Sequence, residues 1–222
     1  MRRLVKGLLL LGAVVGLGIA TAAPKQQTPS HHDAACGGCP SESNASSPLS
    51  LTGRKVSNHA FVVLANGNGI KEGTLVTIAN LLKRDGVRGL VLDFVGTQCP
   101  YSRQQLQGVT KAIALQDGKA KGALVATVFV DADAQAVRRA LKQRPVNTLV
   151  LWDKGGKVAR QWQIKATPTV VVVRKDGQVI ATYTGMAPPH PDMYQHFFAS
   201  VLTAVANGSP PPPHPMMGVG GG

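Results

Sequence analysis

Cysteine and acidic residues are both scarce in this chain of 222 residues. Cys36, Cys39 and Cys99 are the only cysteines, so Cys99 has no close neighbour in the sequence with which to form a local disulfide. Aspartate and glutamate total 11 against 24 lysines and arginines, and a net charge near +10 remains when the three basic residues of the first 22 are discounted. No recognisable nucleic-acid-binding module accompanies this charge, so we expect no nucleic-acid partner. The chain also has no internal repeat.

Charged residues are absent from positions 7–24, which follow a short basic start. This apolar stretch includes the small residues Ala-Thr-Ala at 20–22, the pattern of a signal-peptide cleavage site. We therefore predict that residues 1–22 are an export signal. If it stays uncleaved, the uncharged run is at the short end of the roughly 17 to 25 residues that span a bilayer, which allows a membrane anchor. We therefore expect the protein to be periplasmic or otherwise extracytoplasmic. An uncleaved N-terminal segment would anchor it to the inner membrane.

Apolar periodicity is absent from residues 23–50, which are rich in serine, proline and glycine and are predicted to form a flexible arm. Residues 207–222 combine a proline run with methionine and glycine, a composition that cannot build a core, so we expect a disordered tail. The remaining residues, 51–206, suffice for one ordinary domain with a sizeable core.

Strand and helix patterns alternate within residues 51–206. This alternation predicts an α/β fold with a central mixed, mostly parallel sheet, helices on both faces and an antiparallel hairpin at one end. An extra helix and strand are expected between Asp133 and Trp152, with Asp131 or Asp133 as the N-cap of that helix. We expect strands at 59–64, 89–95, 123–130, 148–152, 168–174 and 178–184, and helices at 75–84, 100–116, 134–142, just before 164, and at 191–206.

The most informative local pattern surrounds Cys99. An apolar, β-branched run at 89–95 is followed by a Gly-Thr turn and then by Cys99 and Pro100, which predicts a buried strand that delivers one cysteine to the first turn of a helix. Pro100 suits the first helical position because its missing N–H would be unpaired there anyway. The free N–H groups and the helix dipole stabilise a thiolate at Cys99, and the thiolate is the nucleophile. We therefore predict a reactive Cys99 rather than an inert core residue.

This segment resembles the redox motif of the thioredoxin superfamily. Asp93 and Phe94 stand where that family has a buried acidic residue, six positions before the reactive cysteine, followed by phenylalanine. The segment 166–170, Ala-Thr-Pro-Thr-Val, resembles the family's cis-proline loop, and a predicted hairpin follows it. The extra helix and strand before this loop resemble the TlpA-like and redoxin branch, so the resemblance implies a thioredoxin-like fold.

The resemblance also implies roles for the residues near Cys99. Asp93 would assist proton transfer, with a pKa raised by apolar surroundings, although a merely satisfied buried carboxylate is the alternative. Pro168 would form a cis bond that holds Thr167 beside Cys99 to pair with a substrate strand, the alternative being an ordinary turn proline. Pro100 and Tyr101 would contact the substrate.

The motif departs from the usual Cys-x-x-Cys at its last position. The sequence is Cys99-Pro100-Tyr101-Ser102, so no disulfide can form within the motif. Ser102 either fills the space of a former thiol or donates a hydrogen bond that lowers the pKa of Cys99. Gln98 stands where the family commonly has an aromatic residue, which is a second departure from the motif.

Cys36 and Cys39 form a Cys-x-x-Cys pair within the predicted arm. In an oxidising compartment such a pair closes a structural disulfide, exchanges with another thiol, or holds a soft metal with help from imidazoles. Zinc normally takes four ligands, so one pair is a weak metal signal. The missing second thiol at position 102 favours the redox alternative, in which Cys36 or Cys39 resolves a mixed disulfide at Cys99.

These observations predict an exported thiol–disulfide oxidoreductase that acts on protein thiols or disulfides through one motif cysteine, without a cofactor or an assigned metal site. The alternative is a non-catalytic protein that captures thiols or handles copper. Peroxide reduction is disfavoured because no serine or threonine lies three residues before Cys99. The copper alternative would use Cys36, Cys39, His31, His32, His214, Met216 and Met217.

Basic residues 138, 139, 142 and 144 fit a solvated face, or a contact with anionic lipid or an acidic partner.

Overall fold

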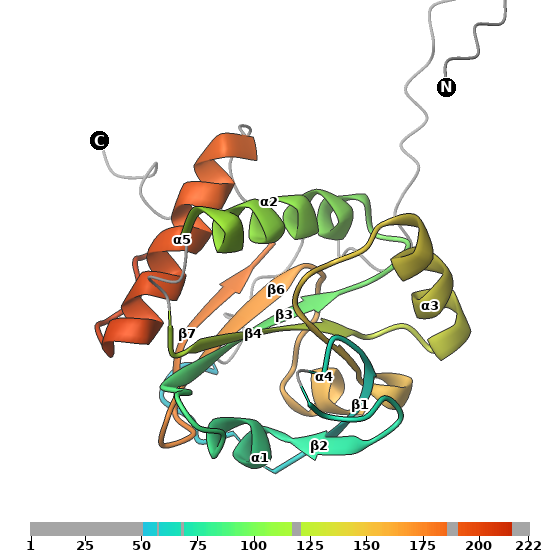
Figure 1. The fold of residues 1–222 in the computed structure, drawn as a ribbon, viewed down its shortest axis with the longest axis horizontal. Helices are drawn as coiled ribbons and strands as arrows, with labels where there is room; N and C mark the ends of the chain where they lie inside the picture. Colours follow the sequence, from blue (N-terminus) through green and yellow to red (C-terminus); the bar gives the residue numbers. More distant parts are fainter. Residues whose placement is uncertain (1–50, 57, 68, 117–120, 186–190, 215–222) are drawn as a thin grey trace, which may run out of the picture. The chain divides into compact units, whose positions relative to one another are not determined.

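The computed structural model describes residues 51–56, 58–67, 69–116, 121–185 and 191–214. They form one seven-stranded sheet with the strand order β2-β1-β5-β4-β3-β6-β7 (Figure 1). The strands are β1 (Ala60–Ala65), β2 (Leu75–Thr77), β3 (Gly89–Val95), β4 (Ala123–Phe129), β5 (Leu149–Trp152), β6 (Thr169–Arg174) and β7 (Val179–Thr184). The helices are α1 (Ile78–Leu82), α2 (Pro100–Gln116), α3 (Ala134–Gln143), the 3-10 turn η1 (Lys154–Gly156), α4 (Lys157–Gln161) and α5 (Pro191–Asn207).

The predicted α/β class is confirmed, including a helix and strand inserted before the proline loop. Parallel pairing is confined to the centre of the sheet, where β4 lies between β3 and β5. The other four pairings are antiparallel, so the sheet is mixed but less parallel than the sequence suggested. The reason is that β1 and β6 run opposite to the central strands.

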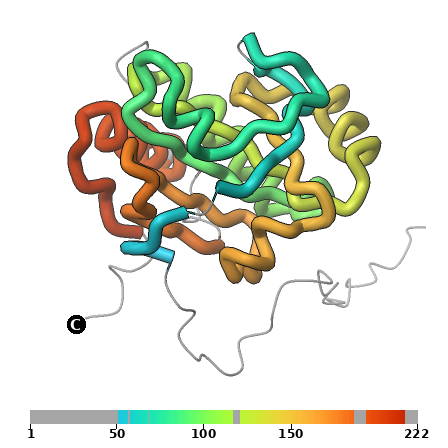
Figure 2. The backbone as a smooth tube through the Cα atoms, turned by 90° about the horizontal axis from the view of Figure 1, so that it is seen from below, coloured from blue at the N-terminus to red at the C-terminus, as the bar shows by residue number. Residues whose placement is uncertain are grey.

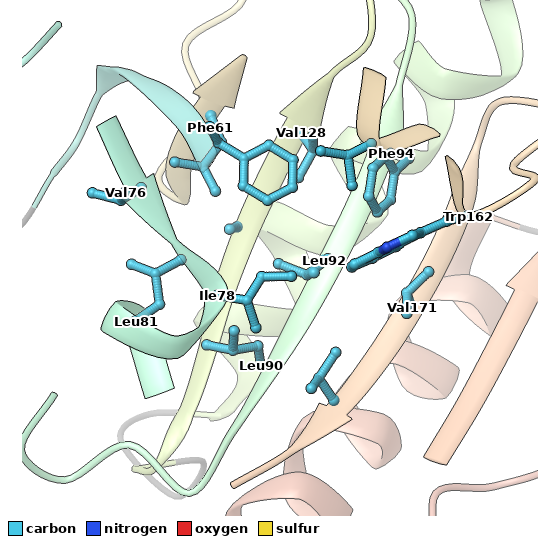
Figure 3. Close-up of a cluster of buried hydrophobic side chains, with 14 of the residues drawn as sticks. Phe61, Val76, Ile78, Leu81, Leu90, Leu92, Phe94, Val128, Trp162 and Val171 are labelled. Atoms are coloured by element: carbon cyan, nitrogen blue, oxygen red, sulfur yellow. The ribbon is translucent and has the colours of Figure 1, made fainter. Parts of the chain in front are cut away.

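Strand β3 is buried along its whole length and divides the core into two sides. Because side chains alternate along a strand, Leu90, Leu92 and Phe94 face one side while Val91 and Asp93 face the other. Figure 3 shows the first set packed with residues such as Ile78 and Trp162, whose ring lies 5.7 Å from that of Phe94. Helices α2 and α5 cover the second side (Figure 1). Asp93 is therefore a carboxyl group that points into a core of aromatic and aliphatic side chains.

The predicted helix at 75–84 is wrong in its first three residues. Leu75–Thr77 is the short strand β2, which pairs antiparallel with β1, and α1 begins only at Ile78. The Thr77 side chain caps this helix by accepting a hydrogen bond from the Asn80 N–H at 3.1 Å. Apolar spacing alone did not reveal this boundary, because a three-residue edge strand carries almost no periodicity.

Two segments that flank the core elements lie against the sheet. Residues 51–56 run along the turn between β6 and β7, with a bridge between Lys55 and Gln178 (Figure 2). The predicted tail is in contact with the domain up to residue 214, since the Tyr183 hydroxyl donates to the Pro212 carbonyl at 2.6 Å. The tail prediction is thus wrong for this part, because Tyr183 on β7 and Phe197 on α5 pack against the His214 ring. No helix in the described ranges is long and apolar enough to cross a membrane.

Candidate active site

Cys99 lies at the junction between β3 and α2, as its sequence context predicts. Its carbonyl accepts a hydrogen bond from the Arg103 N–H at 3.2 Å, and Pro100 is the first residue of α2. The Cys99 residue as a whole is 7% exposed, so it is almost completely covered. The N–H groups of the first turn of a helix carry partial positive charge and favour a thiolate there. Within the described residues Cys99 forms no disulfide.

The thiol of Cys99 faces the loop that precedes β6. Its Sγ donates to the Thr167 carbonyl oxygen at 3.2 Å. The Thr167–Pro168 peptide bond is cis, and the Pro168 carbonyl accepts from the Gly185 N–H at 3.0 Å. The Thr169 hydroxyl donates to the Ala166 carbonyl at 2.8 Å and fixes the same turn. The two motifs, 68 residues apart in the chain, thus meet at one thiol.

Ser102 is fully buried one helical turn after Cys99. Its hydroxyl accepts from the Gly96 N–H at 3.3 Å, which ties the loop before Cys99 to α2. Burial acts to raise the pKa of Cys99, but hydrogen bonds from the Ser102 side chain and backbone, with smaller ones from Thr167 and Tyr101, bring the pKa below its ordinary value. Hydrogen bonding from Ser102 is thus the main cause that lowers the pKa of Cys99.

Asp93 belongs to a buried polar chain that joins three elements. Gln105 on α2 donates from its amide to Asp93 Oδ1, and the Tyr194 hydroxyl on α5 donates to the Gln105 carbonyl oxygen. Asp93 Oδ2 is buried and has no hydrogen-bond partner among the described residues. Gly108 leaves room for this arrangement, because a Cβ there would lie 2.7 Å from the Tyr194 ring. Each member of the chain is at least 93% buried.

Burial raises the pKa of Asp93 to about 7, and the hydrogen bond from Gln105 opposes this rise only in part. Burial, together with the charge of Asp93, also raises the pKa of Tyr194, so this hydroxyl stays protonated and acts as a donor. Near neutral pH the Asp93 carboxyl can therefore both release and accept a proton. Groups with pKa values close to the working pH are the most effective proton-transfer groups in catalysis.

Sequence reasoning missed Gln105 and Tyr194. One signal was available for Gln105, because it lies three residues after Ser102 and four before Val109, on the buried face of α2. A polar residue at such a position needs a buried partner. No signal in the sequence connects Tyr194 to it, since the two residues are 89 positions apart.

The loop before Cys99 is held by Asp131, one of the two proposed helix caps. Its carboxylate accepts from the Thr97 N–H at 3.1 Å and from the Thr97 hydroxyl at 2.5 Å. Asp133 is the cap of α3 and accepts from the Gln135 and Ala136 N–H groups. Asp131 thus contributes to the site by fixing the backbone next to Cys99.

The remaining predicted residues are placed as follows. Tyr101 is 50% exposed and Pro100 is exposed, so both lie on the surface beside Cys99. Thr167 is half-buried. Cys36 and Cys39 lie outside the described residues, as do the histidines and methionines of the copper alternative except His214. The described part of the chain contains no group of three or more histidine, cysteine or acidic side chains that could hold a metal.

A sequence model of the redoxin family matches residues 69–196, more than half of the chain. This chain belongs to the redoxin family. The matched region of this redoxin contains Asp93, Cys99, Ser102 and the Thr167–Pro168 loop. The predicted branch of the thioredoxin superfamily is thereby confirmed.

Curated relatives of this redoxin include two proteins named thiol-disulfide oxidoreductase ResA. That of Halalkalibacterium halodurans is 24% identical over 98 residues, covering 44% of this chain and 54% of the relative. That of Bacillus thuringiensis subsp. konkukian is 28% identical over 98 residues, covering 44% and 56%. The chain spans about half the length of the curated relatives that it matches.

Solved structures with the same fold include two bacterial proteins. A Chlorobium tepidum protein assigned as thiol:disulfide interchange protein DsbE superposes with a TM-score of 0.53 at 22% identity, covering 65% of this chain and 93% of that one. An uncharacterised conserved protein of Geobacillus kaustophilus gives a TM-score of 0.55 at 16% identity, covering 72% and 85%. At these identities the likeness establishes the fold alone.

Proposed function

We propose that this redoxin is an exported thiol–disulfide oxidoreductase that acts through Cys99 by forming mixed disulfides with proteins. The observation that carries the proposal is the setting of the Cys99 thiol, which lies directly before the first residue of α2, contacts the Thr167 carbonyl and has a lowered pKa. The names of the ResA relatives support the same chemistry. The apolar, uncharged segment at 7–24 supports export to an extracytoplasmic compartment, with a membrane tether if the segment is retained.

The first step is the attack of the Cys99 thiolate on one sulfur of a substrate disulfide. A bond forms between Cys99 Sγ and that sulfur, the substrate S–S bond breaks, and the other sulfur leaves as a thiolate. Protonated Asp93 supplies a proton toward the leaving thiolate, and the ionised form takes one up when a thiol is activated in the reverse direction. A pKa of about 7 allows Asp93 to do both near neutral pH.

The substrate backbone is positioned by the loop opposite Cys99. The Thr167 carbonyl is within reach of the thiol, and Tyr101, two residues after Cys99, exposes half of its surface. An extended substrate segment can add to this loop through main-chain hydrogen bonds, a mode that suits many sequences. Pro168 holds the loop in the shape required.

The setting of Cys99 predicts that its thiol is alkylated faster than a free cysteine at neutral pH. In the full chain with Cys36 and Cys39 replaced by serine, the rate of reaction with iodoacetamide against pH should give an apparent pKa below the ordinary value of about 8.5. Ser102→Ala should raise this pKa, because it removes the hydroxyl that stabilises the thiolate. Ser200→Ala, the same change at an exposed hydroxyl on α5, is the control. An ordinary pKa in the parent protein would reject the proposed function.

Completion of a catalytic cycle needs a second thiol, and we propose that Cys36 or Cys39 supplies it. Attack by either thiolate on the Cys99 side of the mixed disulfide would release the substrate as a dithiol and leave a disulfide between Cys99 and the arm. The substrate gains two electrons and the protein dithiol loses them, so an external dithiol must then reduce the enzyme. A tether can give an effective concentration in the millimolar range when it spans the gap.

This proposal predicts that Cys36→Ser with Cys39→Ser still allows the first attack but then turns over more slowly than the wild type, because only the external dithiol can attack the mixed disulfide. Mass spectrometry after mild oxidation of the wild type should find Cys99 linked to Cys36 or Cys39, whereas the double variant should accumulate mixed disulfides with a peptide substrate. Turnover is measured with the same peptide disulfide and a dithiol reductant. Equal turnover by both proteins, with no link to the arm, would exclude the arm as the resolving element.

A further inference from the structure

A groove lies beside the candidate active site, between helices α2 and α3. It has a volume of about 560 Å³. One wall is the loop of Gly96, Thr97 and Gln98, and Cys99 is the next residue in the chain. Figure 1 shows α3 beside the end of α2 at which Cys99 lies. A molecule held in this groove would therefore be next to the nucleophile.

The side chains that line the groove include four cations and no carboxylate: Arg103, Lys111, Arg139 and Arg144. Arg139 is 3.7 Å from the exposed carboxylate of Asp133. Within the described ranges the side chains of the other three form no ion pair. The Asp131 carboxylate lies behind the loop wall, where it accepts hydrogen bonds from Thr97. A positive field in a concave site concentrates anionic ligands.

The floor of the groove is apolar. Leu106, Phe129 and Val146 line it. Phe129 belongs to a buried hydrophobic cluster with Val95, and the partly buried Leu106 and Val146 pack against that cluster. A simple inorganic anion would leave this surface uncovered. A ligand that matches both features carries an apolar side chain between carboxylates, as a peptide segment rich in glutamate or aspartate and containing leucine does.

We propose that this groove binds an acidic segment of the substrate protein, with an apolar residue inserted toward Leu106 and Val146, next to the cysteine that Cys99 attacks. The inference rests on the proposed function, because a segment held beside Cys99 is a substrate segment only if Cys99 attacks that protein. Its physical basis is separate, since it depends on the charge and shape of the groove rather than on thiol chemistry. The groove thus selects among substrates, while Cys99 performs the exchange.

The binding test uses the full chain and a fluorescent peptide with three glutamates and one leucine beside a serine, so that no disulfide can form. A matched peptide carries glutamine in place of glutamate. At low salt the acidic peptide should bind about tenfold more tightly than the glutamine peptide, since three exposed charge pairs contribute modestly and are screened by salt. The triple variant Arg103→Gln, Lys111→Gln, Arg144→Gln should remove this preference.

A second triple variant controls for net charge. Lys121→Gln, Lys154→Gln and Lys157→Gln remove the same charge from exposed positions outside the groove, and should retain the preference for the acidic peptide. Loss of the preference in this control as well, or equal binding of both peptides by the wild type, would overturn the proposal. The proposal would also be overturned if phosphatidylglycerol vesicles or a short oligonucleotide, at equal charge, displaced the fluorescent peptide as effectively as the unlabelled acidic peptide does.

Turnover of disulfide versions of the same peptides separates the two proposals. A wild type that binds the acidic peptide selectively but reduces neither peptide would reject the proposed function and retain the groove. A wild type that reduces both at the same rate, without selective binding, would retain the function and reject the groove.

Discussion

Cys99→Ser is expected to lower the rate of thiol–disulfide exchange by at least about a thousandfold, because a hydroxyl is not ionised at neutral pH and the nucleophile is lost. The fold should tolerate the change. Serine is close to cysteine in size, and its hydroxyl can still donate to the Thr167 carbonyl that now accepts from Cys99 Sγ at 3.2 Å. The measurement is the reduction of a peptide disulfide under a dithiol reductant, with circular dichroism and thermal unfolding to verify the fold.

The matched control for Cys99→Ser is the double variant Cys36→Ser, Cys39→Ser, which makes the same chemical change at the other two cysteines. It should still form a mixed disulfide in the first round. Exchange that persists in Cys99→Ser and disappears in the double variant would place the reactive thiol in the arm and contradict the site proposed for this redoxin.

Asp93→Asn is expected to remove a pH dependence of stability that the wild type shows between about pH 4 and pH 7. Burial raises the pKa of Asp93 to about 7 in the folded state, from 3.8. Between these values the folded protein binds more protons than the unfolded chain, so stability is highest at low pH and falls as pH rises. The loss levels off above pH 7 and amounts to as much as about 4 kcal/mol, since each pKa unit corresponds to 1.36 kcal/mol.

The measurement is the free energy of unfolding in urea at several pH values for the wild type and for Asp93→Asn. The difference between them should move in favour of the variant as pH rises from 4 to 7, whatever constant cost the asparagine amide adds beside Gln105. Asp85→Asn, the same change at an exposed carboxylate, should not alter the slope. Parallel curves for the wild type and Asp93→Asn would show that the Asp93 carboxyl does not carry the shifted pKa.

Several features of the site could be anticipated from the chain because they are local. The run at 89–95 is followed by Gly96, and Pro100 follows the cysteine, so a strand, a turn and a helix start are fixed within about ten residues. The cap of α3 shows the limit of such reasoning. Asp131 and Asp133 were equivalent candidates in sequence, and contact with Thr97, 34 positions earlier, assigned Asp131 to the active-site loop instead.

The sequence by itself determined the α/β class, the place of Cys99 at a helix start, the absence of a second motif thiol and the uncharged apolar segment near the N-terminus. These follow from residue types at short spacing, where side-chain periodicity and helix-end chemistry operate. Tertiary structure alone decided which polar groups satisfy one another inside the core and which cations face one groove. Gln105 reaches Tyr194, and Arg103 shares a groove with Arg144, because packing brings together residues far apart in the chain.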